Sequence, residues 1–244
     1  MDSKAAIHTN FGKKLTVGNV QIPDPRPDQV LVKLHSSGIC HSQLHQMHNP
    51  DSPTPSLLGH EGTGTVIAKG SEVDHLKEGD LAIVTWVNRT PIKGRPTFPH
   101  TGVTYNEAPL NGATYTWGEH VLVRGGYVVK IPKQSNKYSS SIVGCAVLTG
   151  AGAVLHTAKV KPEDSVAIFG VGGVGLSALI MAKILEAYPI IAVDISDEKL
   201  QFAKKFGATH LINSSKQDPI EAIHEITSGG SDYSFDTVGL RITN

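Results

Sequence analysis

The sequence has little of several features that would assign it to a specialised class of protein. Only 2 of its 244 residues are cysteine, which excludes the small secreted scaffolds held together by disulfide bonds. Aromatic residues make up 6%, charged residues 18% and hydrophobic residues 39%, which is the composition of an ordinary globular protein. Lysine plus arginine and aspartate plus glutamate each number 22, so no excess of charge is available to hold nucleic acid or an anionic membrane.

Long apolar segments are also missing. No stretch approaches the roughly 20 apolar residues that a membrane-spanning helix needs, and residues 1–6 do not resemble a signal peptide. We therefore expect a cytoplasmic protein with neither nucleic acid nor membrane as a partner. In a reducing cytosol, Cys40 and Cys145 are not expected to form a disulfide. The 12 histidines leave a mixed Cys/His metal site open.

The pattern of the chain changes between residues 140 and 150. In the first part, short runs of β-forming residues are separated by turns rich in proline and glycine, which predicts a small barrel or sandwich. The clearest runs are 30–34, 64–68, 81–84 and 120–123. Residues 88–117 have no clear periodicity and are predicted to be a long loop.

The second part alternates strands and helices. Predicted strands at 165–169, 190–193, 211–212 and 235–238 are separated by predicted helices at 174–185, 197–206 and 220–227. This alternation indicates a parallel sheet with helical crossovers. The expected fold is thus a β domain over residues 1–145, followed by an α/β domain over residues 146–244.

A glycine-rich segment follows the first strand of the α/β part. Gly170, Gly172 and Gly175 fit the pattern G-x-G-x-x-G, with Gly173 as a fourth glycine, between a predicted strand and a predicted helix. In that context the pattern is typical of dinucleotide binding, because the glycines let the backbone and the helix N-terminus approach a pyrophosphate. Asp194, 19 residues beyond Gly175, ends the next strand, where a carboxylate would bind the adenosine ribose and disfavour a 2′-phosphate. These residues predict NAD as the cofactor, and the alternative is a glycine turn in a flavodoxin-like sheet with a solvated aspartate.

Three further motifs complete a pattern that runs along almost the whole chain. They are Gly38-Ile39-Cys40-His41-Ser42-Gln43-Leu44-His45, Gly59-His60-Glu61-Gly62 and Gly144-Cys145-Ala146-Val147-Leu148-Thr149-Gly150. Together with the glycine loop, and in this order, they resemble the medium-chain, zinc-dependent alcohol dehydrogenase family. The resemblance implies a GroES-like β-barrel catalytic domain followed by a Rossmann domain.

The resemblance implies one catalytic zinc, with Cys40, His60 and Cys145 as its three protein ligands. Two thiolates and an imidazole with an open fourth position suit a catalytic zinc, which acts as a Lewis acid on an alcohol. Taken singly, a buried cysteine is more often a small apolar residue, and a histidine is more often a polar residue with ordinary partners.

The resemblance also assigns roles to residues around the metal and the cofactor. Glu61 is expected to support the metal, Ser42 to take the proton of the substrate, and His45 to pass that proton on. Contacts with the cofactor are implied for His41, Thr149, Val174 and Lys199. Trp86 is expected to flank the substrate pocket, although a core tryptophan is the alternative, and Ser42 and His45 could be unremarkable polar residues of a loop.

Three departures from the family pattern affect what we expect. The cysteine-free segment 88–117 excludes the second, structural zinc of many members, which needs four cysteines. Gln43 stands where an aspartate usually accepts a hydrogen bond from the zinc-bound histidine. Only about four of the six strands of a Rossmann sheet can be placed, so we expect an incomplete cofactor domain that lacks the edge through which the full-length form would make a homo-oligomer.

The expected function is hydride transfer between an alcohol and NAD to give an aldehyde or ketone. A polyol dehydrogenase of the same family shares the fold and the cofactor, and a non-catalytic nucleotide-binding protein is an alternative from another class. A zinc-free quinone reductase would lack the Cys/His ligands. The sequence does not identify the alcohol or the physiological direction.

Overall fold

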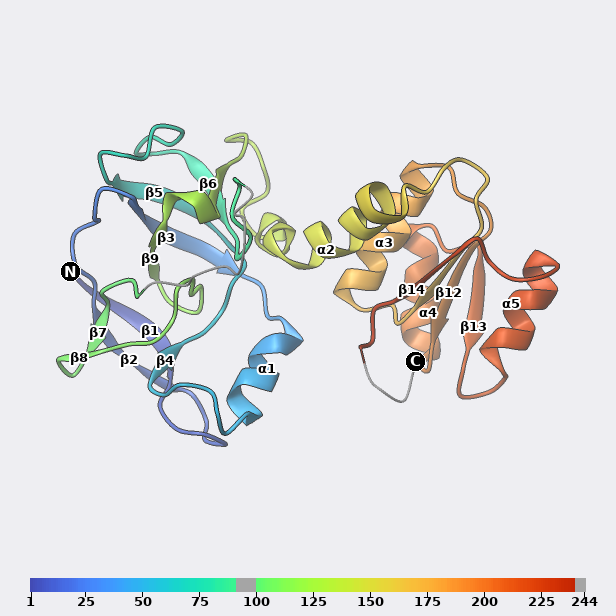
Figure 1. Cartoon of the computed structure of the whole chain (residues 1–244), viewed down its shortest axis with the longest axis horizontal. Helices are drawn as coiled ribbons and strands as arrows, with labels where there is room; N and C mark the ends of the chain where they lie inside the picture. The colour runs from blue at the N-terminus through green and yellow to red at the C-terminus, as the bar shows by residue number, and fades with distance from the viewer. Residues whose placement is uncertain (91–99, 240–244) are drawn as a thin grey trace. The chain divides into compact units, whose positions relative to one another are not determined.

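The computed structural model describes residues 1–90 and 100–239. They form two compact units, Met1–Cys145 and Ala146–Asn244, which are coloured blue to green and yellow to red in Figure 1. No helix within the described ranges combines the length and the apolar content needed to cross a bilayer.

Antiparallel strands build the first unit, in two five-stranded sheets ordered β4-β1-β2-β7-β8 and β10-β6-β5-β3-β9. The strands are β1 (Asp2–His8), β2 (Thr16–Gln21), β3 (Gln29–Ser37), β4 (Ser56–Leu57), β5 (Gly62–Lys69), β6 (Leu81–Val84), β7 (Thr104–Tyr105), β8 (Ala108–Pro109), β9 (His120–Arg124) and β10 (Val128–Lys130). One hydrophobic cluster takes residues from both sheets, among them Ile7, Val20, Val32 and Val121. A curled β domain is thus formed, as the sequence predicts.

Helices are short in this unit. One α-helix, α1 (His41–His48), follows β3, and two 3₁₀ helices, η1 (Gly125–Tyr127) and η2 (Ser139–Gly144), lie later in the chain. The expectation of a loop over 88–117 is wrong in part, because β7 and β8 pair as a small hairpin. Residues 91–99 of that segment lie outside the described residues.

A four-stranded parallel sheet ordered β13-β12-β11-β14 forms the centre of the second unit. Its strands are β11 (Val166–Phe169), β12 (Ile190–Asp194), β13 (His210–Asn213) and β14 (Tyr233–Asp236). The strand order reverses at β11, because β12 lies on one side of it and β14 on the other. In sheets of this kind, ligands bind beyond the carboxyl ends of the strands at such a reversal.

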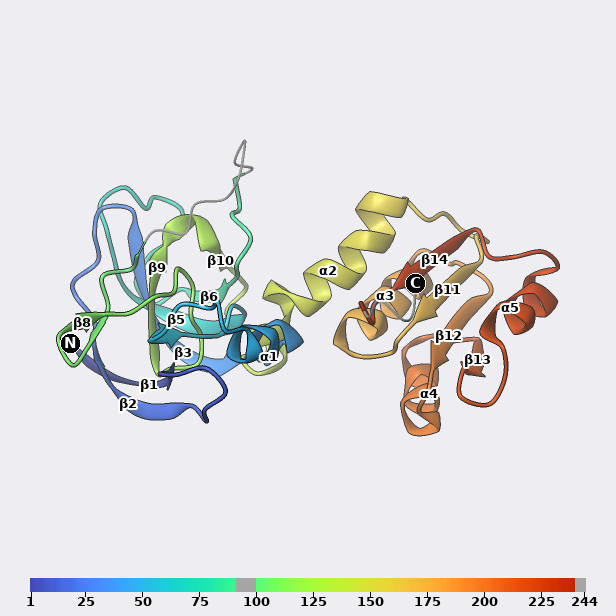
Figure 2. The same ribbon diagram turned by 60° about the horizontal axis from the view of Figure 1, so that its bottom comes forward.

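Helices cover both faces of this sheet (Figures 1 and 2). They are α2 (Ala146–Gly152), the π-helix η3 (Ala153–Ala158), α3 (Gly173–Ile184), α4 (Asp197–Ala203), the 3₁₀ helix η4 (Lys204–Phe206) and α5 (Pro219–Thr227). Leu179 of α3 and Leu200 of α4 belong to one hydrophobic cluster, and Ile223 of α5 belongs to another. The two clusters take alternate residues of β11 and β12. Side chains of alternate strand residues point to opposite faces, so each helix packs on the residues that face it.

The last predicted strand is displaced from the expected 235–238. The strand instead spans Tyr233–Asp236, where Tyr233 pairs with Val166 and Asp236 with Phe169. Tyr233 and Phe235 pack half-buried against the core, whereas Val238 is exposed. The alternation of apolar and polar residues from 233 to 236 indicates the observed strand. The prediction lay two residues too far along the chain because it counted Val238 as a strand residue.

Candidate metal centre

Three potential metal ligands converge in the first unit from distant parts of the chain. Cys40 directly precedes α1, His60 lies between β4 and β5, and Cys145 follows η2. Their ligand atoms all lie within 4.8 Å of one another. Zinc binds sulfur at about 2.3 Å and imidazole nitrogen at about 2.0–2.1 Å, so one ion could hold all three after a small contraction.

His60 presents one ring nitrogen to this cluster. Its Nε2 is buried and has no hydrogen-bond partner among the described residues, whereas its Nδ1 lies 2.5 Å from the amide nitrogen of Gln43. Burial lowers the pKa of His60 below its usual value, so the ring is neutral at neutral pH. A buried neutral imidazole with an unpartnered nitrogen fits a metal ligand, because buried polar atoms are rarely left unsatisfied.

The thiol of Cys145 is unfavourable to ionise without a cation. Burial, followed by the nearby Cys40 and Glu61, raises the pKa of Cys145 to about 12. A metal must therefore displace a proton from this thiol when it binds, as is usual for thiolate ligands. Two thiols and one imidazole, with no fourth ligand among the described residues of the cluster, match the donor set of a catalytic zinc.

Glu61 lies beside this cluster and is buried, with 3% of its surface exposed. A Cβ on Gly38 would come within 2.4 Å of its carboxylate, so Gly38 makes room for the acid. The backbone oxygen of Glu61 accepts hydrogen bonds from the N–H of Gly38 and from the hydroxyls of Ser37 and Thr116. Its carboxylate is close enough to contribute to the raised pKa of Cys145.

A pocket of about 700 Å³ opens beside the three ligands. It is lined by Cys40, Ser42, Gln43, Gln46, Pro53, Leu57, Leu58, Gly59, His60, Trp86, His100, Asn111, Gly112, Ala113, Thr114 and Cys145. Ser42 lines it with a hydroxyl oxygen that is buried and has no partner among the described residues. Trp86 is 45% exposed, so the alternative of a core tryptophan is wrong, and its ring meets that of His60 edge-on at 6.3 Å.

Two further expected site residues of the first unit, His41 and His45, lie on α1. The sequence patterns did not reveal this helix. His41 and His45 are exposed, one helical turn apart, with ring centroids 4.9 Å from each other. Ser42 and His45 are three residues apart, which places them on neighbouring positions of the helix surface. The alternative placed Ser42 and His45 in a loop, and that placement is wrong because both residues belong to α1.

The glycine loop lies at the carboxyl end of β11, where the strand order reverses. Gly170 has a φ of +87°, and a Cβ on Gly175 would lie 1.9 Å from the backbone oxygen of Gly170. Gly172, by contrast, has nothing within 4 Å of its would-be Cβ and precedes the first turn of α3 at Gly173. The first glycine makes the turn, the third allows the close approach of helix and strand, and the second leaves backbone open to a ligand.

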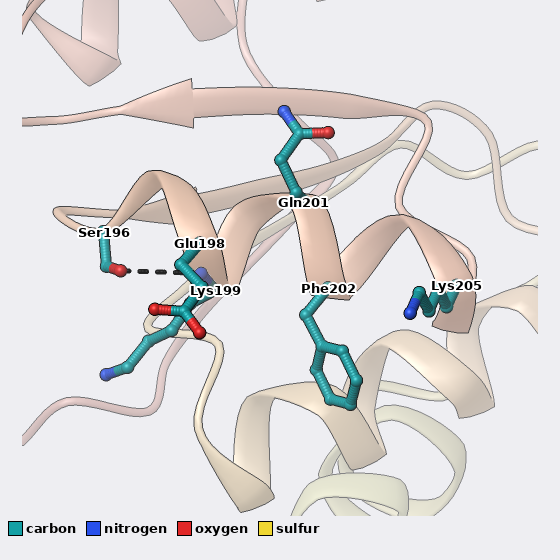
Figure 3. Close-up of a pocket in the computed structure, with 6 residues that line it drawn as sticks. All are labelled: Ser196, Glu198, Lys199, Gln201, Phe202 and Lys205. Carbon is teal, nitrogen blue, oxygen red and sulfur yellow. Dashed lines mark hydrogen bonds between the residues drawn. The ribbon is translucent and has the colours of Figure 1, made fainter.

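Asp194 ends β12 and contacts this loop directly. Its carboxylate accepts hydrogen bonds of 3.0 Å from the backbone N–H of Val171 and of Ser196. Lys199 lies on the first turn of α4, where its backbone N–H donates to the hydroxyl of Ser196 (Figure 3). A surface hollow runs along α4 past Glu198, Lys199 and Phe202, close in sequence to Asp194.

Two residues expected at the cofactor lie on adjacent helices of the second unit. Thr149 is exposed on α2, and Val174 is half-buried on the first turn of α3. A Cβ on Gly150 would lie 2.1 Å from the backbone oxygen of Val174, so α2 and α3 pack closely next to Thr149.

Sequence patterns missed most of the pocket wall. Asn111, Gly112, Ala113 and Thr114 fall in the segment predicted as a loop, and Gln46 lies one turn beyond Gln43 on the unpredicted helix. Only Leu57 and Leu58 carried a signal, because they directly precede the Gly-His-Glu motif. Pocket walls built from loops have no periodicity by which a sequence could reveal them.

Comparison with known proteins gives matches in both units. Residues 26–133 match the alcohol dehydrogenase GroES-like domain, and residues 173–243 match a family described as zinc-binding dehydrogenase. The S-(hydroxymethyl)glutathione dehydrogenase of Escherichia coli (strain SMS-3-5 / SECEC) is 33% identical to this chain over an alignment of 265 residues, gaps included. The alignment covers 98% of this chain and 72% of that protein.

Solved structures resemble the chain over its full length. Benzyl alcohol dehydrogenase from Acinetobacter calcoaceticus is 34% identical with a TM-score of 0.91, and the match covers 100% of this chain and 72% of that one. A protein described as a zinc-binding dehydrogenase from Sinorhizobium meliloti 1021, solved with bound NADP, is 27% identical with a TM-score of 0.81 and the same coverage.

Proposed function

Because the chain belongs to the medium-chain, zinc-dependent alcohol dehydrogenase family, we propose that one zinc held by Cys40, His60 and Cys145 serves hydride transfer between an alcohol and NAD. The observation that carries this proposal is the convergence of two thiols with an unpartnered, buried imidazole nitrogen. Zinc bound there supplies a Lewis acid that lowers the pKa of an alcohol hydroxyl. The products are an aldehyde or ketone and the reduced cofactor.

Ser42 and His45 take the proton that the alcohol loses. The hydroxyl oxygen of Ser42 has no other partner among the described residues, so it is free to accept a hydrogen bond from the substrate in the pocket. His45 lies three residues along the same helix and is exposed, so its imidazole can exchange the proton with solvent. Glu61, whose carboxylate lies against Gly38, would stabilise the positive charge of a bound zinc.

NAD is the proposed cofactor, held by the glycine loop of the second unit. The open backbone at Gly172 and the N-terminus of α3 favour the pyrophosphate. Asp194 accepts hydrogen bonds from the ribose hydroxyls and repels a 2′-phosphate. Lys199 contributes to the ribose site, and Thr149 and Val174 to the nicotinamide site.

The pocket favours an alcohol with an apolar or aromatic body. Trp86, Leu57 and Leu58 supply apolar surface beside the ligands, and none of the described lining residues is a lysine or arginine. An anionic substrate would find no fixed positive charge among them, and the polyol alternative would leave this apolar surface in contact with hydroxyl groups. Benzyl alcohol, named in one structural relative, has the required shape.

The proposed ligands require reduced thiols, which fits a cytoplasmic location, and both cysteines are free in the structure. A homo-oligomer is proposed on the analogy of the family alone.

The test is alcohol oxidation with and without metal. We expect NAD-dependent oxidation of benzyl alcohol to stop when a chelator removes the metal and to return when zinc is restored. Sorbitol should be oxidised at least tenfold less efficiently, as measured by kcat/KM. Activity that survives complete removal of the metal contradicts the proposal, and a preference for sorbitol favours the polyol alternative.

A further inference from the structure

Gln43 is a buried side chain placed between the backbone of Cys40 and the ring of His60. It is 2% exposed on the first turn of α1. Its carbonyl oxygen accepts a hydrogen bond of 3.2 Å from the backbone N–H of Cys40, and its amide nitrogen lies 2.5 Å from Nδ1 of His60. The amide therefore connects one proposed metal ligand with the backbone of another.

This arrangement fits one tautomer of the His60 ring. An amide nitrogen is only a donor, so Nδ1 must be the bare nitrogen and Nε2 must carry the hydrogen. A metal needs the opposite tautomer, because it binds a bare Nε2 and leaves the hydrogen on Nδ1. In the metal-bound protein, the N–H of Cys40 and the Nδ1–H of His60 thus both require an acceptor.

A glutamine has one oxygen for these two donors. Turning the amide over satisfies His60, but it then points the amide nitrogen at the N–H of Cys40, where two donors meet. A carboxylate would present an oxygen to each donor. We propose that Gln43 is a positioning residue that opposes metal binding: occupancy by zinc forces its amide to turn and breaks the hydrogen bond at the start of α1.

The inference rests on the proposed zinc site and adds a coupling between that site and the helix. α1 carries Ser42 and His45, the residues proposed to move the proton. The helix that positions them therefore begins at the hydrogen bond that metal binding breaks. A buried donor left without an acceptor destabilises the metal-bound state. A chain with a carboxylate at position 43 avoids this cost, and losing such a partner typically changes metal affinity by roughly 10- to 100-fold.

The variant that tests the inference is Gln43→Glu, which has the same shape with a second oxygen. Gln46→Glu is the matched control, because Gln46 lines the same pocket one helical turn away and receives the same added charge. Zinc affinity is measured by competition with a chromophoric chelator. We expect Gln43→Glu to bind zinc about tenfold more tightly, and Gln46→Glu to change affinity by less than about threefold. An equal gain in both variants would mean that charge alone acts, and no gain at position 43 would also overturn the inference.

A second measurement follows the hydrogen bond itself. The exchange of the Cys40 backbone N–H with solvent is recorded by NMR in the wild-type chain and in Gln43→Glu, each with and without zinc. We expect zinc to speed this exchange in the wild-type chain and to leave it unchanged in the variant. Equal protection of Cys40 in the zinc-bound and metal-free wild-type chain would overturn the inference. Failure of the wild-type chain to bind zinc would instead contradict the proposed function.

Discussion

At the scale of single residues, Asp194 has two tasks at the end of β12. Its carboxylate holds the backbone of Val171 and Ser196, and we propose that it also binds the ribose of a dinucleotide. The sequence predicted the second task from the spacing to the glycine loop. It did not reveal the first, because hydrogen bonds from a carboxylate to loop backbone leave no pattern in the sequence.

Replacing Asp194 with serine should therefore narrow the preference for NAD over NADP by about tenfold or more. Loss of the negative charge removes repulsion of the 2′-phosphate, which at contact distances amounts to a few kcal/mol at most. The dissociation constants of both reduced cofactors can be measured by fluorescence titration. Asp197→Ser is the control, since Asp197 is an exposed acid nearby that pairs with Lys216. An unmodified chain that binds NADP more tightly than NAD would contradict the role of Asp194.

The glycines of the loop make a sharper pair of variants, because their surroundings differ. Gly175→Ala should destabilise the second unit by about 3 kcal/mol, since its Cβ would overlap the backbone oxygen of Gly170 and force helix and strand apart. Gly172→Ala should leave stability within about 0.5 kcal/mol, because its φ of −77° suits alanine and the space around it is open. It should nevertheless weaken cofactor binding by blocking approach to the backbone. Urea unfolding and cofactor titration separate the two effects, and equal stability losses would contradict this account.

At the scale of elements, Asp80 ties the turn before β6 to the edge strand β10. Its carboxylate accepts the backbone N–H of Lys77 at 2.9 Å and pairs with the ammonium group of Lys130 at 2.7 Å. The hydrogen bond from Lys130 is the main reason that the pKa of Asp80 lies below its usual value. The sequence predicted a glycine-containing turn before β6, but not the partner strand, since β10 is only three residues long.

The pH dependence of this contribution follows from the lowered pKa. A carboxyl group with a lower pKa in the folded state stabilises the fold above its unfolded pKa of about 3.9, and that stabilisation is lost as the pH falls through the folded pKa. Asp80→Asn should cost about 1–2 kcal/mol of unfolding free energy at pH 7, and the difference from wild type should shrink below pH 4. Asp28→Asn is the control, because the pair of Asp28 with Arg124 is exposed and should contribute less than about 0.5 kcal/mol. A penalty for Asp80→Asn that is unchanged at pH 3 would show that charge is not its cause.

Elements were predicted best where the sequence has a strong apolar signal. The strands β11 and β12 and the helices α3 and α5 lie within one or two residues of the predicted ranges, because buried parallel strands and the helices that cover them have strong apolar patterns. Helix α1 was missed because its residues are mostly polar and only Gln43 is buried. The two-residue strands β4, β7 and β8 are too short to show an alternation.

At the scale of the whole molecule, the sequence predicted both fold types, and the comparisons confirm the family that the motifs indicated. The ligand cluster is a different matter, since Cys145 follows Cys40 by 105 positions in the sequence and only the folded β domain brings them together. Spacing alone could not have shown that convergence; the resemblance to known motifs suggested it. Only the hydrogen-bond geometry shows that Gln43 presents a donor to Nδ1 of His60, where a metal-bound ring needs an acceptor.

The most direct test of the central claim is the zinc content of the purified chain after dialysis. Elemental analysis should give one zinc per chain for the wild-type protein and less than about a tenth of that for the Cys40→Ala, Cys145→Ala double variant. Circular dichroism should show that both proteins remain folded, because metal ligation is not needed to bury the two-sheet core. A folded wild-type chain without zinc, or a double variant that retains one zinc per chain, would contradict the assignment of Cys40, His60 and Cys145 as the metal centre.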